Sequence, residues 1–451
     1  MLSKIKDFIL PSDKRGNKIG KNVLWLGGLQ GVSILTSFML VPLTIDYVTT
    51  SQYGLWLTIS SIVGWFALVD IGLGAGLRNR LTEALSKEDI ILAKKLVSTT
   101  YFSLAALVVV LFFVFNIINQ FIPWATVLNQ PESMEALLSK TMYVVVTFFF
   151  VRLVVQLIGV VLTAHMLPAA ATALSTIGNV VTLAVIWIAS KNTEGDLWAL
   201  SSILSTIPVF IYILASIYFF AGRYSLIRPS FKYFDKTKLR TILGLGFGFF
   251  FINISTIILY QTSNILIIQL FNNEEVVVYN VAYKLFSVIT IIFGIVIQPF
   301  WTGYTDAWVK RDMVWIENTI KKLMVIWKLL TVSGIVLLIL SPWLYKIWIG
   351  GDVEVPFVLS LLVFLYFSLH CYGGVFNIFI NGTGKIRLQM VALGAVALIY
   401  VPLALLFVKV FNFGISSLPL ALIISNFYSL FVARIQYKRL IKGTAKGIWN
   451  R

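Results

Sequence analysis

The amino-acid sequence predicts an all-α polytopic membrane protein. Three observations predict this class: 59% of the 451 residues are hydrophobic, only 12% are charged, and the mean hydropathy is +0.90. A soluble domain needs more polar residues than this to cover its surface. The apolar runs are also continuous over about 20 residues, the length of a helix that crosses a bilayer, whereas strands of a membrane barrel are short and alternate.

Twelve hydrophobic segments are predicted to span the membrane. They are residues 22–45, 54–76, 97–120, 140–164, 168–190, 197–220, 241–270, 277–303, 323–347, 355–380, 386–410 and 414–435. The two termini and the loops after every second segment hold 29 of the 36 Lys and Arg residues. By the positive-inside rule, both termini are therefore cytoplasmic. This topology accounts for the net charge of +17, and nothing in the sequence predicts a nucleic-acid partner.

An internal repeat divides the chain into two halves. Residues 83–89, after the second span, match residues 306–312, after the eighth span. Because each half has six spans, both halves have the same orientation, which implies a pseudo-two-fold axis along the membrane normal. The predicted organisation has four parts: an N-terminal six-helix bundle over 1–222, a basic cytoplasmic linker over 223–240, a C-terminal six-helix bundle over 241–440 and a basic cytoplasmic tail over 441–451.

Arg152 lies in the middle of the fourth span, where a charged side chain in contact with lipid is costly. Gln156, Gly159 and Thr163 follow it at helical spacing, so the four residues form one polar or small face. Asp70 is the only acidic residue well inside a span, and it lies near the cytoplasmic end of the second. We therefore expect Arg152 and Gln156 to line a cavity that binds an anion. The alternative is a structural ion pair inside the bundle.

Further polar side chains fall within other spans. Lys284 and Asn280 share a face near the outer end of the eighth span, and Lys328 lies near the cytoplasmic end of the ninth. Lysine side chains at such depths can also reach the headgroups by snorkelling. The remaining candidates for a hydrophilic cavity are Gln30 in the first span and Asn253, Tyr260 and Asn264 in the seventh. The alternative is that these polar stripes hydrogen-bond neighbouring helices.

A glycine-rich stretch over residues 71–77 ends the second span. Gly72 and Gly76 form a Gly-x-x-x-Gly pattern, which allows two helices to approach closely. Basic residues follow directly, at the depth of the inner-leaflet headgroups, where topology alone would also place them. The candidates for headgroup binding or gating are Asp70, Arg78, Arg80 and Lys328.

The sequence shows no catalytic or metal-binding constellation. One cysteine and two histidines are too few for a Cys- or His-based metal site. There is no Ser/His/Asp set, no pair of carboxylates at a membrane face and no nucleotide-binding loop. We therefore expect a protein that is not an enzyme and needs neither a cofactor nor a metal.

Three segments resemble a known family. They are residues 53–56 (Tyr-Gly-Leu-Trp), residues 69–81, which close the second span, and residues 298–307 at the end of the eighth. With the twelve spans and short loops, they resemble the bacterial oligosaccharide flippases. These proteins export O-antigen and capsule repeat units and belong to the polysaccharide transporters of the multidrug/oligosaccharidyl-lipid/polysaccharide exporter superfamily. The resemblance covers nearly the whole chain.

The resemblance implies two six-helix bundles that alternate between inward-open and outward-open states in the bacterial inner membrane. The implied substrate is undecaprenyl-diphosphate carrying an oligosaccharide, which is moved to the outer leaflet for O-antigen, lipopolysaccharide or capsule synthesis. Other implied partners are membrane lipids, a polymerase and further polysaccharide-assembly proteins. The family commonly has cavity cations, for which Arg152 and Lys284 are the candidates here. Asn264 stands where relatives often carry a charge, which leaves the coupling ion open.

Three alternative functions remain. A drug or cation exporter of the same superfamily needs acids within the membrane, whereas the mid-span charges here are basic. A polytopic glycosyltransferase or polymerase usually needs a sizeable outer loop with catalytic residues, which this chain lacks. A lipid II flippase is the closer alternative, and it would be essential for growth.

Overall fold

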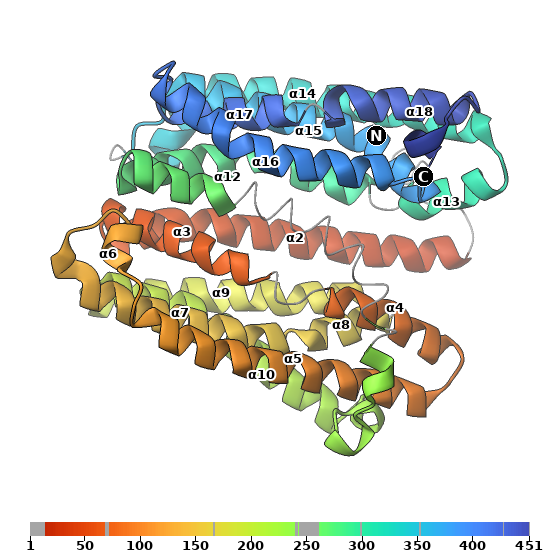
Figure 1. Cartoon of the computed structure of the whole chain (residues 1–451), viewed down its shortest axis with the longest axis horizontal. Coiled ribbons are helices and arrows are strands. Elements are labelled where there is room, and N and C mark those ends of the chain that lie inside the picture. Colours follow the sequence, from red (N-terminus) through yellow and green to blue (C-terminus); the bar gives the residue numbers. More distant parts are fainter. Residues whose placement is uncertain are drawn as a thin grey trace. The chain divides into compact units, whose positions relative to one another are not determined.

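The computed structural model of the protein is helical throughout its regular structure (Figure 1). It describes residues 14–67, 72–165, 167–239, 242, 261–297, 300–350, 353–426 and 428–450. Ten helical segments among these residues are long and apolar enough to cross a membrane, and they coincide with ten of the twelve predicted spans. Of the other two, the span at 54–76 begins as α3 (Thr50–Trp65), and the span at 241–270 lies mostly outside the described residues.

The chain forms two compact units. Unit 1 comprises Met1–Gln52 and Phe66–Phe250, and unit 2 comprises Tyr53–Trp65 and Phe251–Arg451. Most of α3 thus belongs with the C-terminal helices, although it precedes most of unit 1 in the sequence. The boundaries of the predicted six-helix halves stay a prediction.

Long helices packed side by side form unit 1. They are α2 (Lys14–Tyr47), α4 (Leu73–Ser86), α5 (Ile90–Asn119), α7 (Glu135–Val155), α8 (Leu157–Ala164), α9 (Pro168–Asn192) and α10 (Leu197–Ala221). Two short helices, α6 (Trp124–Val127) and η2 (Glu132–Met134), connect α5 to α7, and η3 (Ser225–Ile227) and η4 (Phe231–Tyr233) follow α10. α2 packs along α9, and α10 packs against both α7 and α9.

Unit 2 is organised around α15 (Phe357–Thr383), its most deeply buried long helix among those described. The other long helices are α12 (Asn273–Ile297), α13 (Phe300–Val309), α14 (Met313–Ile349), α16 (Arg387–Lys409), α17 (Ser417–Ser425) and α18 (Ala433–Ile441). Shorter elements are η5 (Gly414–Ser416), the π-helical η6 (Tyr428–Val432) and η7 (Gly447–Asn450). α15 contacts α12, α13, α14, α17, α18 and η6. It therefore positions most of this unit.

The internal repeat is visible in the local geometry of the two matching turns. Glu88 and Arg311 both adopt left-handed backbone conformations, with φ of 56° and 57°. The next residue, Asp89 or Asp312, caps the following helix by accepting a hydrogen bond from a main-chain N–H at 2.9 Å. Non-glycine residues with positive φ are uncommon. Their occurrence at matching positions, with the same cap, shows that the sequence repeat is also a structural repeat.

The basic linker packs against the start of α5. Ser98 Oγ accepts a hydrogen bond from the Ser230 main-chain N–H at 3.1 Å, and Thr99 Oγ1 accepts one from the Asp235 N–H at 3.0 Å. The Lys95 ammonium lies 3.6 Å from the Asp235 carboxylate. The described residues of the linker are therefore held to unit 1 by both main-chain and side-chain contacts.

Two glycines mark close approaches between backbones. A Cβ on Gly54 of α3 would overlap the main-chain carbonyl of Asn273 at the start of α12, within unit 2. A Cβ on Gly76 of α4 would overlap the carbonyl of Ile242, within unit 1. Close packing at Gly76 is what the glycine pattern of the second span predicts.

Candidate functional site

The first candidate site is a cavity of about 410 Å³ in unit 1. It lies between α4, the junction of α7 and α8, α9 and α10. Among the described residues, its polar lining consists of Arg78, Gln156, Thr163 and Tyr212, and none of its lining residues is acidic. Since the polar groups come from α4, from the span that comprises α7 and α8, and from α10, the cavity depends on the packing of these helices.

The fourth span changes its winding at this cavity. α7 ends at Val155 and α8 begins at Leu157, with Gln156 between them. The Gly159 N–H donates to the Gln156 carbonyl at 2.9 Å, a hydrogen bond over three residues that tightens the helix locally. Gln156, Gly159 and Thr163 all line the cavity, so the turn places the predicted polar face there.

Arg78 supplies the positive charge of this lining. Its side chain is exposed, and no carboxylate lies within ion-pair distance of it in the described part of the chain. Arg80 differs, because its guanidinium contacts Glu83 at 2.9 Å, and Glu83 also contacts Lys87 at 2.9 Å. The hydrogen bonds from Lys87 and then Arg80 lower the pKa of Glu83. Arg78 is therefore available to an anion, whereas Arg80 already has a counter-ion.

Arg152 lies beside the cavity rather than in its lining. It precedes Gln156 by one helical turn, its side chain is exposed, and it interacts electrostatically with Tyr212, which does line the cavity. No ion pair of Arg152 occurs among the described residues, whose salt bridges are those of Glu83 and Asp235. The structure thus brings together Arg78, Arg152 and Gln156 out of the predicted residues.

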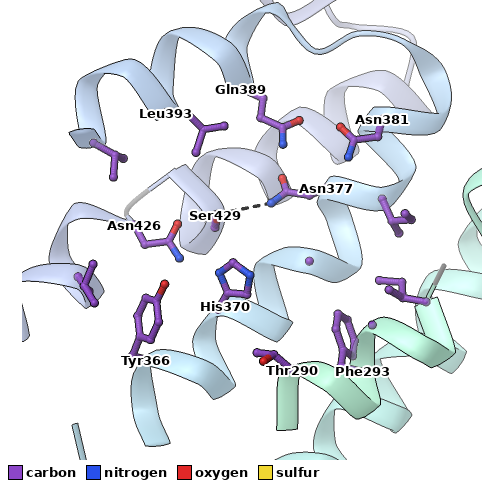
Figure 2. Close-up of a pocket in the computed structure, with 16 residues that line it drawn as sticks. Thr290, Phe293, Tyr366, His370, Asn377, Asn381, Gln389, Leu393, Asn426 and Ser429 are labelled. Carbon is purple, nitrogen blue, oxygen red and sulfur yellow. Dashed lines mark hydrogen bonds between the residues drawn. The ribbon is translucent and has the colours of Figure 1, made fainter. Parts of the chain in front are cut away.

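A second cavity, of about 370 Å³, lies within unit 2 (Figure 2). It is lined by α12, α15, α16 and the segment from α17 to η6. Polar and aromatic side chains project into it from α15, and further amides come from Gln389 of α16 and from Asn426. No Asp, Glu, Lys or Arg is among its lining residues.

The two cavities occupy equivalent places in the repeat. Each is lined by residues from the second, fourth, fifth and sixth spans of its own half. In the first half, Arg152, Gln156, Gly159 and Thr163 lie along the fourth span at successive spacings of four, three and four residues. In the fourth span of the second half, His370, Gly374, Asn377 and Asn381 have the same spacing. The last three residues of the first set and all four of the second line their cavities.

The prediction from sequence missed the cavity of unit 2. Its defining feature is three buried amide oxygens, Asn377 Oδ1, Asn381 Oδ1 and Gln389 Oε1, that accept no hydrogen bond from any described residue. A search of the tenth span for polar residues at helical spacing would have identified Asn377 and Asn381, which lie four residues apart. No comparable signal marks Gln389.

Asn264 and Asn280 are hydrogen-bonded to each other within unit 2. Asn280 Nδ2 donates to Asn264 Oδ1 at 2.7 Å, and Asn264 Nδ2 donates to Ser61 Oγ of α3 at 2.8 Å. Neither asparagine is among the residues that line the two cavities. Their contacts are those expected of polar residues that join neighbouring membrane helices.

The other predicted residues lie elsewhere. Gln30 and Lys284 are partly buried and Lys328 is exposed, and none of the three lines either cavity. Asp70, Asn253 and Tyr260 fall outside the described residues. Among those described, no group of three His, Cys, Asp or Glu side chains is arranged to hold a metal ion.

Two curated proteins resemble the chain along most of its length, whereas no protein-family model matches it. The "Putative O-antigen export protein" of Yersinia pseudotuberculosis is 22% identical over 377 residues, which cover 80% of this chain and 82% of that protein. The "Putative O-antigen transporter" of Salmonella typhi is 23% identical over 392 residues, covering 83% and 84%.

Among solved structures, the inward-facing conformation of a multidrug resistance MATE family transporter of the MOP superfamily matches with a TM-score of 0.72. The match covers 92% of this chain and 99% of that one, at 13% identity. The chain has the MATE transporter fold. Transporters of this fold have twelve helices in two bundles, so the predicted fold class is confirmed. The resemblance to oligosaccharide exporters of this superfamily is confirmed as well.

Proposed function

We propose that the chain moves undecaprenyl-diphosphate-linked oligosaccharide repeat units from the cytoplasmic to the outer leaflet of the bacterial inner membrane, by alternating access. The product would feed O-antigen or capsule synthesis, and a polymerase and other assembly proteins would act next. The names of the two relatives and the MATE fold support this proposal. The observation that carries it is the cavity of unit 1, whose described lining includes Arg78 and no acid, with Arg152 one turn from Gln156.

The substrate explains why such a cavity needs basic residues. A diphosphate cannot cross the hydrocarbon layer with its charge exposed, because a bare ion there loses its hydration. Arginine binds phosphate through two parallel hydrogen bonds, and the polar groups of Gln156, Thr163 and Tyr212 can replace part of the remaining hydration. The polyprenyl tail needs no polar groups around it, since it is as apolar as the lipid.

The depth of the cavity fits loading from the cytoplasm. Its residues Arg78 and Thr163 lie at the ends of the second and fourth spans, which the charge pattern assigns to the cytoplasmic side. A lipid-linked substrate made in the cytoplasmic leaflet would therefore meet Arg78 at headgroup level. Arg152 lies deeper, at mid-span, where it would receive the diphosphate as it moves inward.

Replacement of the two arginines tests the proposal. We expect Arg78→Ala and Arg152→Ala each to reduce surface polysaccharide at normal protein levels, and the double variant to leave lipid-linked repeat units on the cytoplasmic leaflet. Arg80→Ala is the matched control, because Arg80 is two residues away but paired with Glu83. The measurements are surface polysaccharide by gel and the accessibility of the precursor to a membrane-impermeant sugar-oxidising probe. Normal export by the double variant would refute the proposal.

Two other functions within the superfamily predict different phenotypes. A drug exporter would change the drug susceptibility of a deletion strain, and a lipid II flippase would be essential for growth. We expect a viable deletion strain that lacks surface polysaccharide and has unchanged drug susceptibility. The absence of acidic side chains from both cavity linings favours this outcome over export of cationic drugs.

A further inference from the structure

The cavity of unit 2 contains acceptors that lack donors. Asn377 Oδ1, Asn381 Oδ1 and Gln389 Oε1 are buried, and no described residue donates a hydrogen bond to any of them. Gln389 as a whole is only 8% exposed. Buried polar groups in folded proteins are nearly always paired, and each unpaired acceptor costs free energy. Three in one cavity are satisfied by water or by a ligand that brings hydrogen-bond donors, and such a ligand would take the place of the water.

One of the three amides uses its nitrogen within the unit. Asn377 Nδ2 donates a long hydrogen bond to Ser429 Oγ at 3.4 Å, which leaves its oxygen for a ligand (Figure 2). Asn381 follows four residues later on the same face of α15, and Gln389 reaches the same space from α16. Figure 2 shows the three amides grouped together, with His370 and Tyr366 also lining the cavity.

The chemistry of the lining disfavours a phosphate ligand. Three acceptor oxygens repel an anion, and the described lining residues include no Lys or Arg to offset them. The lining also contains no carboxylate to neutralise a cationic drug. A volume of about 370 Å³ falls in the range of small-molecule pockets, about 300–1,000 Å³, and is far larger than a single ion requires. The ligand that fits is neutral, of small-molecule size and rich in O–H donors.

A sugar ring meets these conditions. Each hydroxyl can donate to an amide oxygen and accept from an amide N–H or a hydroxyl such as Thr290. The rings of Phe293 and Tyr366 offer apolar surface to the C–H groups of a pyranose. We infer that the cavity of unit 2 binds a neutral sugar residue of the lipid-linked substrate and discriminates against acidic sugars. This inference rests on the proposed function and assigns the sugar to a site separate from the arginines.

The test uses the purified full chain in lipid nanodiscs and ligand-detected NMR. The probes are methyl glucoside and methyl N-acetylglucosaminide as neutral sugars and methyl glucuronide as the acidic one. We expect saturation transfer to the neutral glycosides and at least fivefold less to the glucuronide. Asn381→Leu combined with Gln389→Met should weaken neutral binding about tenfold, since two hydrogen bonds are lost. The control is Asn116→Leu, which removes an amide from α5 of unit 1, outside both cavity linings.

Each contrary result shows whether the sugar site or the proposed function is wrong. Absence of glycoside signal with the unaltered protein, or an equal signal from the glucuronide, overturns the inference without reliance on any variant. A sodium-dependent rise in thermal stability that the double variant loses, without glycoside binding, assigns the cavity to a cation and also overturns it. If Arg78→Ala blocks export while the amide variant exports normally, the sugar site is wrong and the proposed function stands. If the amides bind sugar but neither variant impairs export, the proposed function fails instead.

Discussion

The substitution Gly54→Ala tests the packing of α3 in unit 2. A Cβ at this position would overlap the main-chain carbonyl of Asn273, which cannot move without displacing the start of α12. Gly394, in the exposed face of α16, has no atom within 4 Å of the same added carbon. Both glycines lie inside helices, so alanine should gain about 0.5–1 kcal/mol of helix propensity at either one. The overlap at Gly54 should cost about 1–3 kcal/mol in addition, as overpacking of a filled contact does.

The two effects predict opposite signs for the two variants. Gly394→Ala should raise the free energy of unfolding by up to about 1 kcal/mol. Gly54→Ala should lie about 1–3 kcal/mol below Gly394→Ala, because the propensity gain is common to both and only the overlap differs. The assay is reversible unfolding of the micelle-bound protein by SDS, followed by tryptophan fluorescence. Changes equal within about 0.5 kcal/mol would refute the close approach of α3 to α12.

Two further predictions follow from the repeat and the linker. Asp89→Ala and Asp312→Ala each remove the N-cap of a long helix, so each should lower the free energy of unfolding by about 1 kcal/mol in the same assay; a loss at one position alone would contradict the structural equivalence of the two turns. The pKa of Asp235 is lowered, first by the hydrogen bond from the Thr237 side chain and also by the charge of Lys95. The stabilisation of the folded linker by the charged Asp235 carboxylate is therefore present above the ordinary pKa of about 4 and is lost as the pH falls through the lowered pKa. Pepsin should cut the linker faster as the pH falls below about 4, and Thr237→Val should shift that onset to higher pH; an onset independent of Thr237 would exclude this contact as the cause.

The spans could be predicted because hydropathy depends on composition alone. A segment such as 97–120 needs no knowledge of its neighbours, and the helix at Ile90–Asn119 confirms it. The repeat could also be predicted, since the turn residues at 83–89 and 306–312 match in the sequence. Hydropathy does not identify the helices against which each span packs. The packing of α3 with the C-terminal helices depends on contacts such as Ser61 with Asn264, some 200 residues apart.

The candidate site could be predicted only in part, for a similar reason. Arg152 and Gln156 stand out from sequence because charge and polarity are rare in a span. Asn264 and Asn280 are also polar residues within spans, yet they are hydrogen-bonded to each other. The sequence of a polar stripe does not show whether its partner is a neighbouring helix or a ligand. The availability of Arg78 depends on its having no carboxylate partner among the described residues, whereas Arg80, with nearly the same sequence context, has one in Glu83.

The comparison of the two cavities explains how one repeated scaffold provides two chemistries. The fourth span of unit 1 contributes Gln156, Gly159 and Thr163 to its cavity, whereas the fourth span of unit 2 contributes Gly374, Asn377 and Asn381. An added Cβ on Gly374 would lie 2.8 Å from the Phe293 ring. A few side chains on corresponding spans thus distinguish a lining with an arginine from a lining with amide oxygens that no described residue pairs. If the first holds the diphosphate, which every lipid-linked substrate shares, and the second holds a sugar, a change of repeat unit requires changes only in the second. Substitutions at the three amide positions should therefore alter which sugar is exported, while Arg78 stays necessary for all of them.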